Sequence, residues 1–234
     1  MPPYSHIDRP SPFAQMSGET LPVWAVSRAD IDRGHFDKTA LGWAKTAGFK
    51  AAEGAVLLVP NRHGKLAGAL FGLGEEGESQ PFIGGTLARA LPRGDWHIET
   101  SPISGAVMAL AFGMGAYRFE AYRKPAPEGP RLVLPADADA DAIRRTVAAV
   151  GLARDLVNTP ANDMGPDALE AAFRSLAKHY KAKGSVVAGD DLLAQGVGHQ
   201  AGDRRWALLS VEDRHRPRTT INPDPGARGD VPGA

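Results

Sequence analysis

The chain has 234 residues, 43% of them hydrophobic, and its 27 Lys and Arg residues balance 27 Asp and Glu residues. This size suffices for one large domain or two small domains with packed cores. The formal net charge of zero argues against nucleic acid or an anionic membrane surface as a partner. The absence of cysteine excludes disulfides and thiolate chemistry and suits a reducing compartment, so we expect a cytoplasmic protein.

Residues 1–20 are polar and proline-rich, without an apolar stretch of signal-peptide length, and predict a disordered leader. No later run approaches the ~20 apolar residues of a membrane span. Beyond the leader, strand-like and helix-like patterns alternate, which predicts an α/β layer domain over residues 21–124. Strands are expected at 21–27, 54–60, 66–74 and 95–100, and helices around 36–47, 83–91 and 104–117.

The segment 125–140 is rich in proline and aspartate and predicts a linker between two domains. A long amphipathic helix is expected from Asp141, and it must end near Asn158 because Pro160 disfavours helical geometry at the preceding residue. Pro166 suits the first position of a second helix, which we expect Gly184 to terminate before a short strand. Read locally, "LVNTPANDMGPDALEAAF" is a rigid elbow between two helices.

Several short segments match part of a known binding motif, but their neighbouring residues argue against the corresponding function. "GLGEEG" at 72–77 has the spacing of a dinucleotide fingerprint, but its glutamates would repel phosphate, so a glycine-rich turn is the better interpretation. "NRHGKL" lacks the first glycine and the Ser/Thr of a phosphate loop, and "DADADA" lacks the glycine and the glutamate of a calcium loop. The histidines show no metal-ligand spacing. The residues alone therefore show no catalytic constellation.

The segment "ARDLVNTPANDMGPDALEAAF" resembles the leucine aminopeptidase (cytosol aminopeptidase) family where its helix leads into the catalytic domain. The residues that carry this signature are Asn158, Pro160, Asn162 and Pro166. Upstream, "AGFKAAEG", "LFGLG", "ALP" and "GAYRFEAYRK" resemble the amino-terminal domain of bacterial members. Gly165 departs from the threonine or serine that is common at this helix cap, although glycine also caps helices.

The resemblance implies an α/β fold in which a smaller, macro-domain-like amino-terminal layer domain precedes the start of an α/β catalytic domain. It also implies an exopeptidase that removes amino-terminal residues from peptides with two divalent ions, Mn, Zn or Mg, and that assembles as a hexamer. Such ions hold the attacking hydroxide and polarise the scissile carbonyl.

The family's metal ligands, a lysine and several carboxylates, have no counterpart in this sequence, so we expect no catalytic residue and no bound metal here. Residues 141–196 are interpreted as an incomplete catalytic domain. Residues 197–234 resemble no part of the family, and we interpret them as a disordered or frame-shifted tail.

Two functional classes remain open at this stage. The first is a truncated leucyl-aminopeptidase-type protein that is inactive alone. The second is a non-catalytic binding or assembly module built on the amino-terminal α/β domain, for which the neutral net charge disfavours nucleic acid as a ligand.

Overall fold

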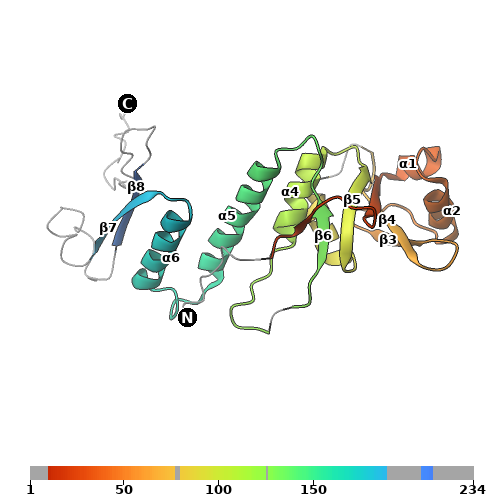
Figure 1. Ribbon diagram of the computed structural model, residues 1–234. Helices are drawn as coiled ribbons and strands as arrows, with labels where there is room; N and C mark the ends of the chain where they lie inside the picture. Colours follow the sequence, from red (N-terminus) through yellow and green to blue (C-terminus); the bar gives the residue numbers. More distant parts are fainter. Residues whose placement is uncertain (1–9, 77–79, 125, 189–206, 213–234) are drawn as a thin grey trace, which may run out of the picture. The chain divides into compact units, whose positions relative to one another are not determined.

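The structure, a computed structural model, describes residues 10–76, 80–124, 126–188 and 207–212 (Figure 1). Contacts along the chain divide it into a first unit that ends at Asn158 and a second unit that begins at Thr159. Each unit is described by itself. The predicted α/β fold class is confirmed, since the first unit combines one mixed sheet with helices.

The sheet of the first unit has six strands in the order β1-β6-β5-β2-β4-β3. All neighbouring strands run parallel except β3 and β4, which form an antiparallel hairpin from the two strands predicted at 54–60 and 66–74. The strands are β1 (Phe13–Ala14), β2 (Leu21–Val26), β3 (Val56–Pro60), β4 (Leu66–Gly72), β5 (Gly94–Thr100) and β6 (Pro130–Val133).

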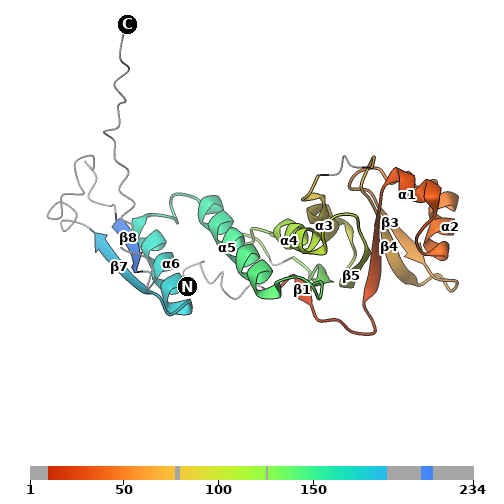
Figure 2. The same ribbon diagram turned by 90° about the horizontal axis from the view of Figure 1, so that it is seen from above.

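Helices cover both faces of this sheet, with α1 and α2 on one side and α3, α4 and the adjoining 3-10 turn η2 on the other (Figures 1 and 2). α5 packs against α4. Ser27 and Asp30 form a capping box that fixes the start of α1 directly after β2. The bounds are α1 (Arg28–Arg33), α2 (Lys38–Thr46), η2 (Ile83–Thr86), α3 (Leu87–Ala90), α4 (Gly105–Gly115) and α5 (Ala140–Asn158).

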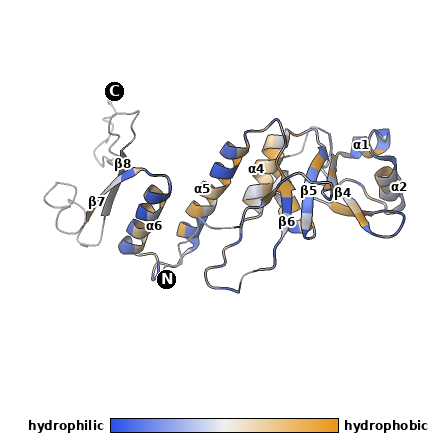
Figure 3. Cartoon of the chain, viewed as in Figure 1, coloured by the Kyte–Doolittle hydropathy of each residue, from blue (hydrophilic) through white to orange (hydrophobic). Residues whose placement is uncertain are grey.

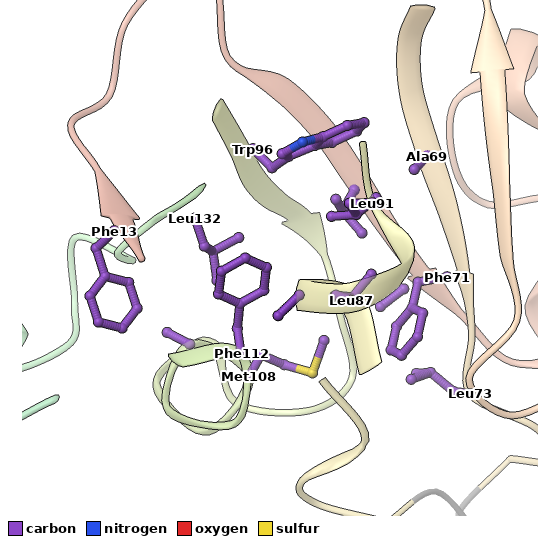
Figure 4. Close-up of a cluster of buried hydrophobic side chains, with 14 of the residues drawn as sticks. Phe13, Ala69, Phe71, Leu73, Leu87, Leu91, Trp96, Met108, Phe112 and Leu132 are labelled. Atoms are coloured by element: carbon purple, nitrogen blue, oxygen red, sulfur yellow. The ribbon is translucent and has the colours of Figure 1, made fainter. Parts of the chain in front are cut away.

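Two apolar clusters fill the layers between sheet and helices. Along β2, Val23 and Ala25 belong to the cluster beneath α4, whereas Trp24 and Val26 belong to the cluster beneath α1 and α2. This alternation is the two-residue period of a strand that is buried on both faces. The cluster beneath α4 brings together side chains from strands and helices that are distant in sequence (Figure 4). Hydrophobic residues accordingly dominate α4 and β4 (Figure 3).

Two segments of the first unit differ from their predicted roles. Phe13 and Ala14, which lie in the predicted disordered leader, form β1, and Phe13 is buried in the cluster beneath α4 (Figure 4). Pro130–Val133, which lie in the predicted linker, form β6 between β1 and β5. The two segments pair with each other, and because neither has a long apolar pattern of its own, local reasoning did not find them. The domain limits drawn from the sequence otherwise stay predictions.

The second unit contains α6 (Pro166–His179), β7 (Lys183–Ala188) and β8 (Ala207–Glu212). The prediction that Gly184 terminates α6 is wrong, because the helix ends at His179 and Gly184 lies within β7. β8 pairs antiparallel with β7, so these six residues of the predicted disordered tail form a strand. The sequence "ALLSVE" carries a short apolar run that the search for a sustained period overlooked. The rest of the predicted tail lies outside the described residues.

Candidate functional site

The residues of the predicted family signature fall on both sides of the division between the units. Asn158 is the last residue of α5 in the first unit, whereas Pro160, Asn162 and Pro166 belong to the second unit. The amides of Asp163 and Met164 both donate to the Pro160 carbonyl at 2.9 Å, which closes a tight turn. Pro166 occupies the start of α6, as the sequence predicted.

Within the first unit, Asn158 belongs to a polar network centred on Tyr117. The Asn158 Nδ2 donates to the Tyr117 hydroxyl at 2.9 Å, and this hydroxyl donates to Asp155 Oδ1 at 2.8 Å. Asp155 is 0% exposed, so its carboxylate depends on such donors. The network therefore fixes the end of α5 against the segment that follows α4.

Arg154 completes this network from the adjacent position on α5. Its guanidinium carbon lies 4.1 Å from the centroid of the Tyr117 ring, a cation–π contact, and its Nη1 donates to the Met114 carbonyl at 3.0 Å. Sequence analysis did not assign roles to Tyr117, Arg154 or Asp155. The sequence signal that could have found this network is the spacing of Asp155 and Asn158, which are three residues apart and therefore share one face of a helix.

Two cavities of the first unit adjoin this network, and both are lined by Tyr117 and Arg154. The first, of about 280 Å³, is mainly apolar and lies among the segment leading into β1, the end of α4, and α5. The second, of about 600 Å³, has a mixed polar and apolar lining that is strongly basic. We call the second one the basic cavity. Its remaining lining residues are Arg89, Arg118, Phe119, Glu120, Arg123, Lys124, Ala126 and Asn158.

The glycine-rich turn "GLGEEG" holds ion pairs in the structure. Gly74 adopts φ +81°, and the two glutamates that follow it pair with arginines of α1: Glu75 with Arg28 at 3.0 Å and Glu76 with Arg33 at 2.8 Å. The hydrogen bond and charge of Arg33 lower the pKa of Glu76. These carboxylates thus anchor the turn to α1, in agreement with its interpretation as a structural element.

Potential metal ligands are scattered over the part of the chain that the structure describes. Within it, no three His, Asp or Glu residues come close enough together to hold an ion. No described helix has both the length and the apolar character of a membrane-spanning segment.

Comparison with known sequences identifies relatives of this chain. Residues 12–135, just over half of the chain, match the family described as M17 aminopeptidase, N-terminal domain. A probable cytosol aminopeptidase of Streptomyces avermitilis is 29% identical over 209 residues, which are 75% of this chain and 40% of the relative. A probable cytosol aminopeptidase of Streptomyces griseus is 30% identical over 216 residues, 76% of this chain and 42% of the relative.

Solved structures show the same likeness. The cytosol aminopeptidase of Coxiella burnetii matches with a TM-score of 0.71 and 28% identity over 84% of this chain and 45% of that chain. The bottromycin maturation enzyme BotP, solved in complex with Mn, matches with a TM-score of 0.58 over 84% of this chain and 46% of its own; at 22% identity it shows the fold alone.

The α/β unit thus defines the class of this part of the chain, the N-terminal domain of the M17 aminopeptidases. The chain belongs to the M17 aminopeptidase family. The resemblance drawn from the signature and the upstream motifs is confirmed. The chain spans about 40% of the length of the curated relatives that it matches.

Proposed function

We propose that the chain acts as the amino-terminal part of a leucyl-aminopeptidase-type enzyme that removes amino-terminal residues from peptides. The observation that carries this proposal is the family match over residues 12–135, which comprise the sheet and α4. The likeness to the Coxiella burnetii enzyme over 84% of the chain supports it. These comparisons do not favour the alternative of a non-catalytic binding or assembly module built on the amino-terminal α/β domain.

The peptidase chemistry of the proposed enzyme requires two divalent ions, Mn, Zn or Mg, and we propose that the described residues hold neither of them. The carboxylates with clear partners serve other purposes: Asp155 accepts from Tyr117, Asp95 pairs with Arg131, and Glu76 pairs with Arg33. We therefore assign no catalytic or metal-binding residue to this chain and expect it to be inactive alone. Peptide substrates, a cytoplasmic location and a hexameric assembly belong to the same proposal.

A direct experiment measures hydrolysis of L-leucine p-nitroanilide by the purified 234-residue chain with Mn²⁺, Zn²⁺ or Mg²⁺. We expect no rate above buffer. A metal-dependent rate that scales with protein concentration and that EDTA abolishes would contradict the assignment of an inactive chain.

A chimera tests the enzymatic context. Residues 12–135 would replace the corresponding domain of the Coxiella burnetii cytosol aminopeptidase, with the unaltered enzyme as control. We expect the chimera to retain metal-dependent hydrolysis and the oligomeric state of the control. A folded chimera that has lost both properties would refute the proposed role of this domain.

A further inference from the structure

The basic cavity concentrates positive charge in a chain whose formal net charge is zero. Its residues come from α3, from the segment between α4 and β6, and from the end of α5, all within the first unit. Its volume of about 600 Å³ lies in the range of small-molecule sites. The charged lining residues are five cations and one carboxylate: Arg89, Arg118, Arg123, Lys124, Arg154 and Glu120.

Most of this charge is not neutralised by the protein. Arg89, Arg118, Arg123 and Lys124 are exposed, and none forms a side-chain ion pair or hydrogen bond with the described residues. Other arginines of the same unit behave differently, since they pair with carboxylates at 2.6–3.0 Å: Arg28 with Glu75, Arg33 with Glu76, Arg93 with Glu128, and Arg131 with Asp95. Unpaired cations such as Arg145 occur elsewhere among the described residues of the unit, but here four of them line one cavity.

Glu120, the one carboxylate among the described lining residues, holds the backbone in place and forms no ion pair with the cations of the cavity. Glu120 Oε1 accepts a hydrogen bond from the Ala126 amide at 3.2 Å, and the Glu120 carbonyl accepts one from the Arg123 amide at 3.1 Å. Both bonds hold the segment after α4 in its fold. This geometry keeps the cations of that segment, Arg118, Arg123 and Lys124, on one short and locally tied stretch of backbone.

Two further lining residues of the cavity, Arg154 and Tyr117, are held in place as well. Arg154 stacks on Tyr117 and donates one N–H to Met114, while Tyr117 is tied to the buried Asp155 and to Asn158. Further N–H groups of the Arg154 fork remain for a ligand. Such pre-organisation lowers the entropy cost of binding, because part of the site is ordered before the ligand arrives.

We propose that the basic cavity binds a small molecule that carries two or more phosphate groups. Arginine forks match phosphate oxygens through paired hydrogen bonds, and a lysine adds a mobile positive charge. One phosphate group carries roughly two negative charges and would leave most of the five cations unmatched. A chain of two or three phosphates carries enough charge and is compact enough for the cavity.

Isothermal titration calorimetry of the full chain tests the proposal with three probes at low salt: orthophosphate, pyrophosphate and tripolyphosphate. We expect affinity to rise in that order, because each added phosphate group can engage another cation. A chain that binds orthophosphate as tightly as tripolyphosphate, or that binds none of the three, would overturn the proposal.

Substitutions locate the binding. The double variant Arg118→Gln/Lys124→Gln should weaken tripolyphosphate binding by about tenfold or more, because it removes two of the five cations that face the phosphates. Arg145→Gln is the matched control, because Arg145 is also exposed and without an ion pair but does not line the cavity. All these positions are exposed, so the variants should keep the wild-type circular dichroism spectrum. Equal losses in the double variant and the control would contradict the assigned site.

A single-stranded oligothymidylate of about 20 nucleotides distinguishes a phosphate compound from a nucleic-acid backbone, which offers the same phosphate chemistry. We expect it to compete with tripolyphosphate only weakly. Tighter binding of the oligonucleotide, lost in the same double variant, would assign the cavity to nucleic acid and refute the proposal of a small ligand.

Discussion

The close approach of α4 and η2 depends on the absence of a side chain at Gly115. A Cβ atom built on Gly115 would lie 2.0 Å from the Gly85 carbonyl oxygen and 2.6 Å from the Gly85 carbonyl carbon. Both are backbone atoms, so no side-chain rotation relieves the collision. Gly115→Ala must therefore push the last turn of α4 away from η2.

The cost follows from the displacement that is needed. Ordinary van der Waals contact begins at 3.4 Å, whereas the added Cβ would start at 2.0 Å. Overpacking of a well-packed core costs about 1–3 kcal/mol, and a backbone collision belongs at the upper end. Alanine regains about 1 kcal/mol over glycine within a helix. We expect a net loss of about 2 kcal/mol in the free energy of unfolding, or roughly 4–8 °C in Tm.

Gly42→Ala is the matched control, because Gly42 lies in α2 and a Cβ there meets nothing within 4 Å. The same substitution should therefore stabilise the protein by about 0.5–1 kcal/mol. Opposite signs at the two positions would separate steric conflict from helix propensity.

Urea unfolding followed by tryptophan fluorescence measures both variants. Three of the four tryptophans, Trp24, Trp43 and Trp96, lie in the first unit. Both variants are therefore compared in a Trp206→Phe background, in which the signal reports on that unit. A lower midpoint with an unchanged slope indicates a loss of stability alone. If Gly115→Ala unfolds at the wild-type urea concentration, or if both variants shift in the same direction, the proposed backbone contact is refuted.

Three further substitutions probe the network, the core and the surface. Tyr117→Phe removes one hydrogen-bond donor to the buried Asp155 and should lower the free energy of unfolding by about 2 kcal/mol in urea titrations; an unchanged midpoint would show that this hydrogen bond contributes no stability. Phe112→Ala empties a fully buried position and should cost about 3–5 kcal/mol, and a loss below about 1 kcal/mol by thermal unfolding would speak against the packed cluster. Arg33→Gln should raise the pKa of Glu76 toward its ordinary value of 4.5 in an NMR titration, because the Arg33 hydrogen bond and charge lower it. The Arg33–Glu76 pair makes a small contribution to stability above the unfolded-state pKa of Glu76, and this contribution is lost as pH falls through the depressed folded-state pKa. The stability of the variant should therefore not show this acid-dependent decrease. An unaltered Glu76 pKa would contradict the ion pair.

The elements that the sequence predicted correctly are those whose signal is contained in a short stretch. β2 and the β3–β4 hairpin show apolar runs bounded by turn residues, and they form where expected. The break between α5 and α6 follows from Pro160 and Pro166, whose backbone restrictions act on their immediate neighbours.

The features that sequence reasoning missed depend on partners far along the chain. β1 is a strand because β6 lies beside it, and Phe13 pairs with Leu132 in the sheet. The Tyr117–Asp155 hydrogen bond likewise joins residues that are 38 positions apart. Neither contact leaves a periodic pattern in its own segment. The basic cavity is a further case, since Arg89 and Lys124 become neighbours of one cavity only once α3 and the segment after α4 are placed.

The pairing of β1 with β6 also bears on the order of events while the protein is synthesised. Phe13 leaves the ribosome early, whereas its partner Leu132 is added after all the other strands of the sheet. β2, β3 and β4 can pair before then, because their partners are close together in the chain. The amino-terminal edge of the sheet must therefore remain open until translation has passed Val133, and completion of that edge is the last step in the vectorial assembly of the six strands.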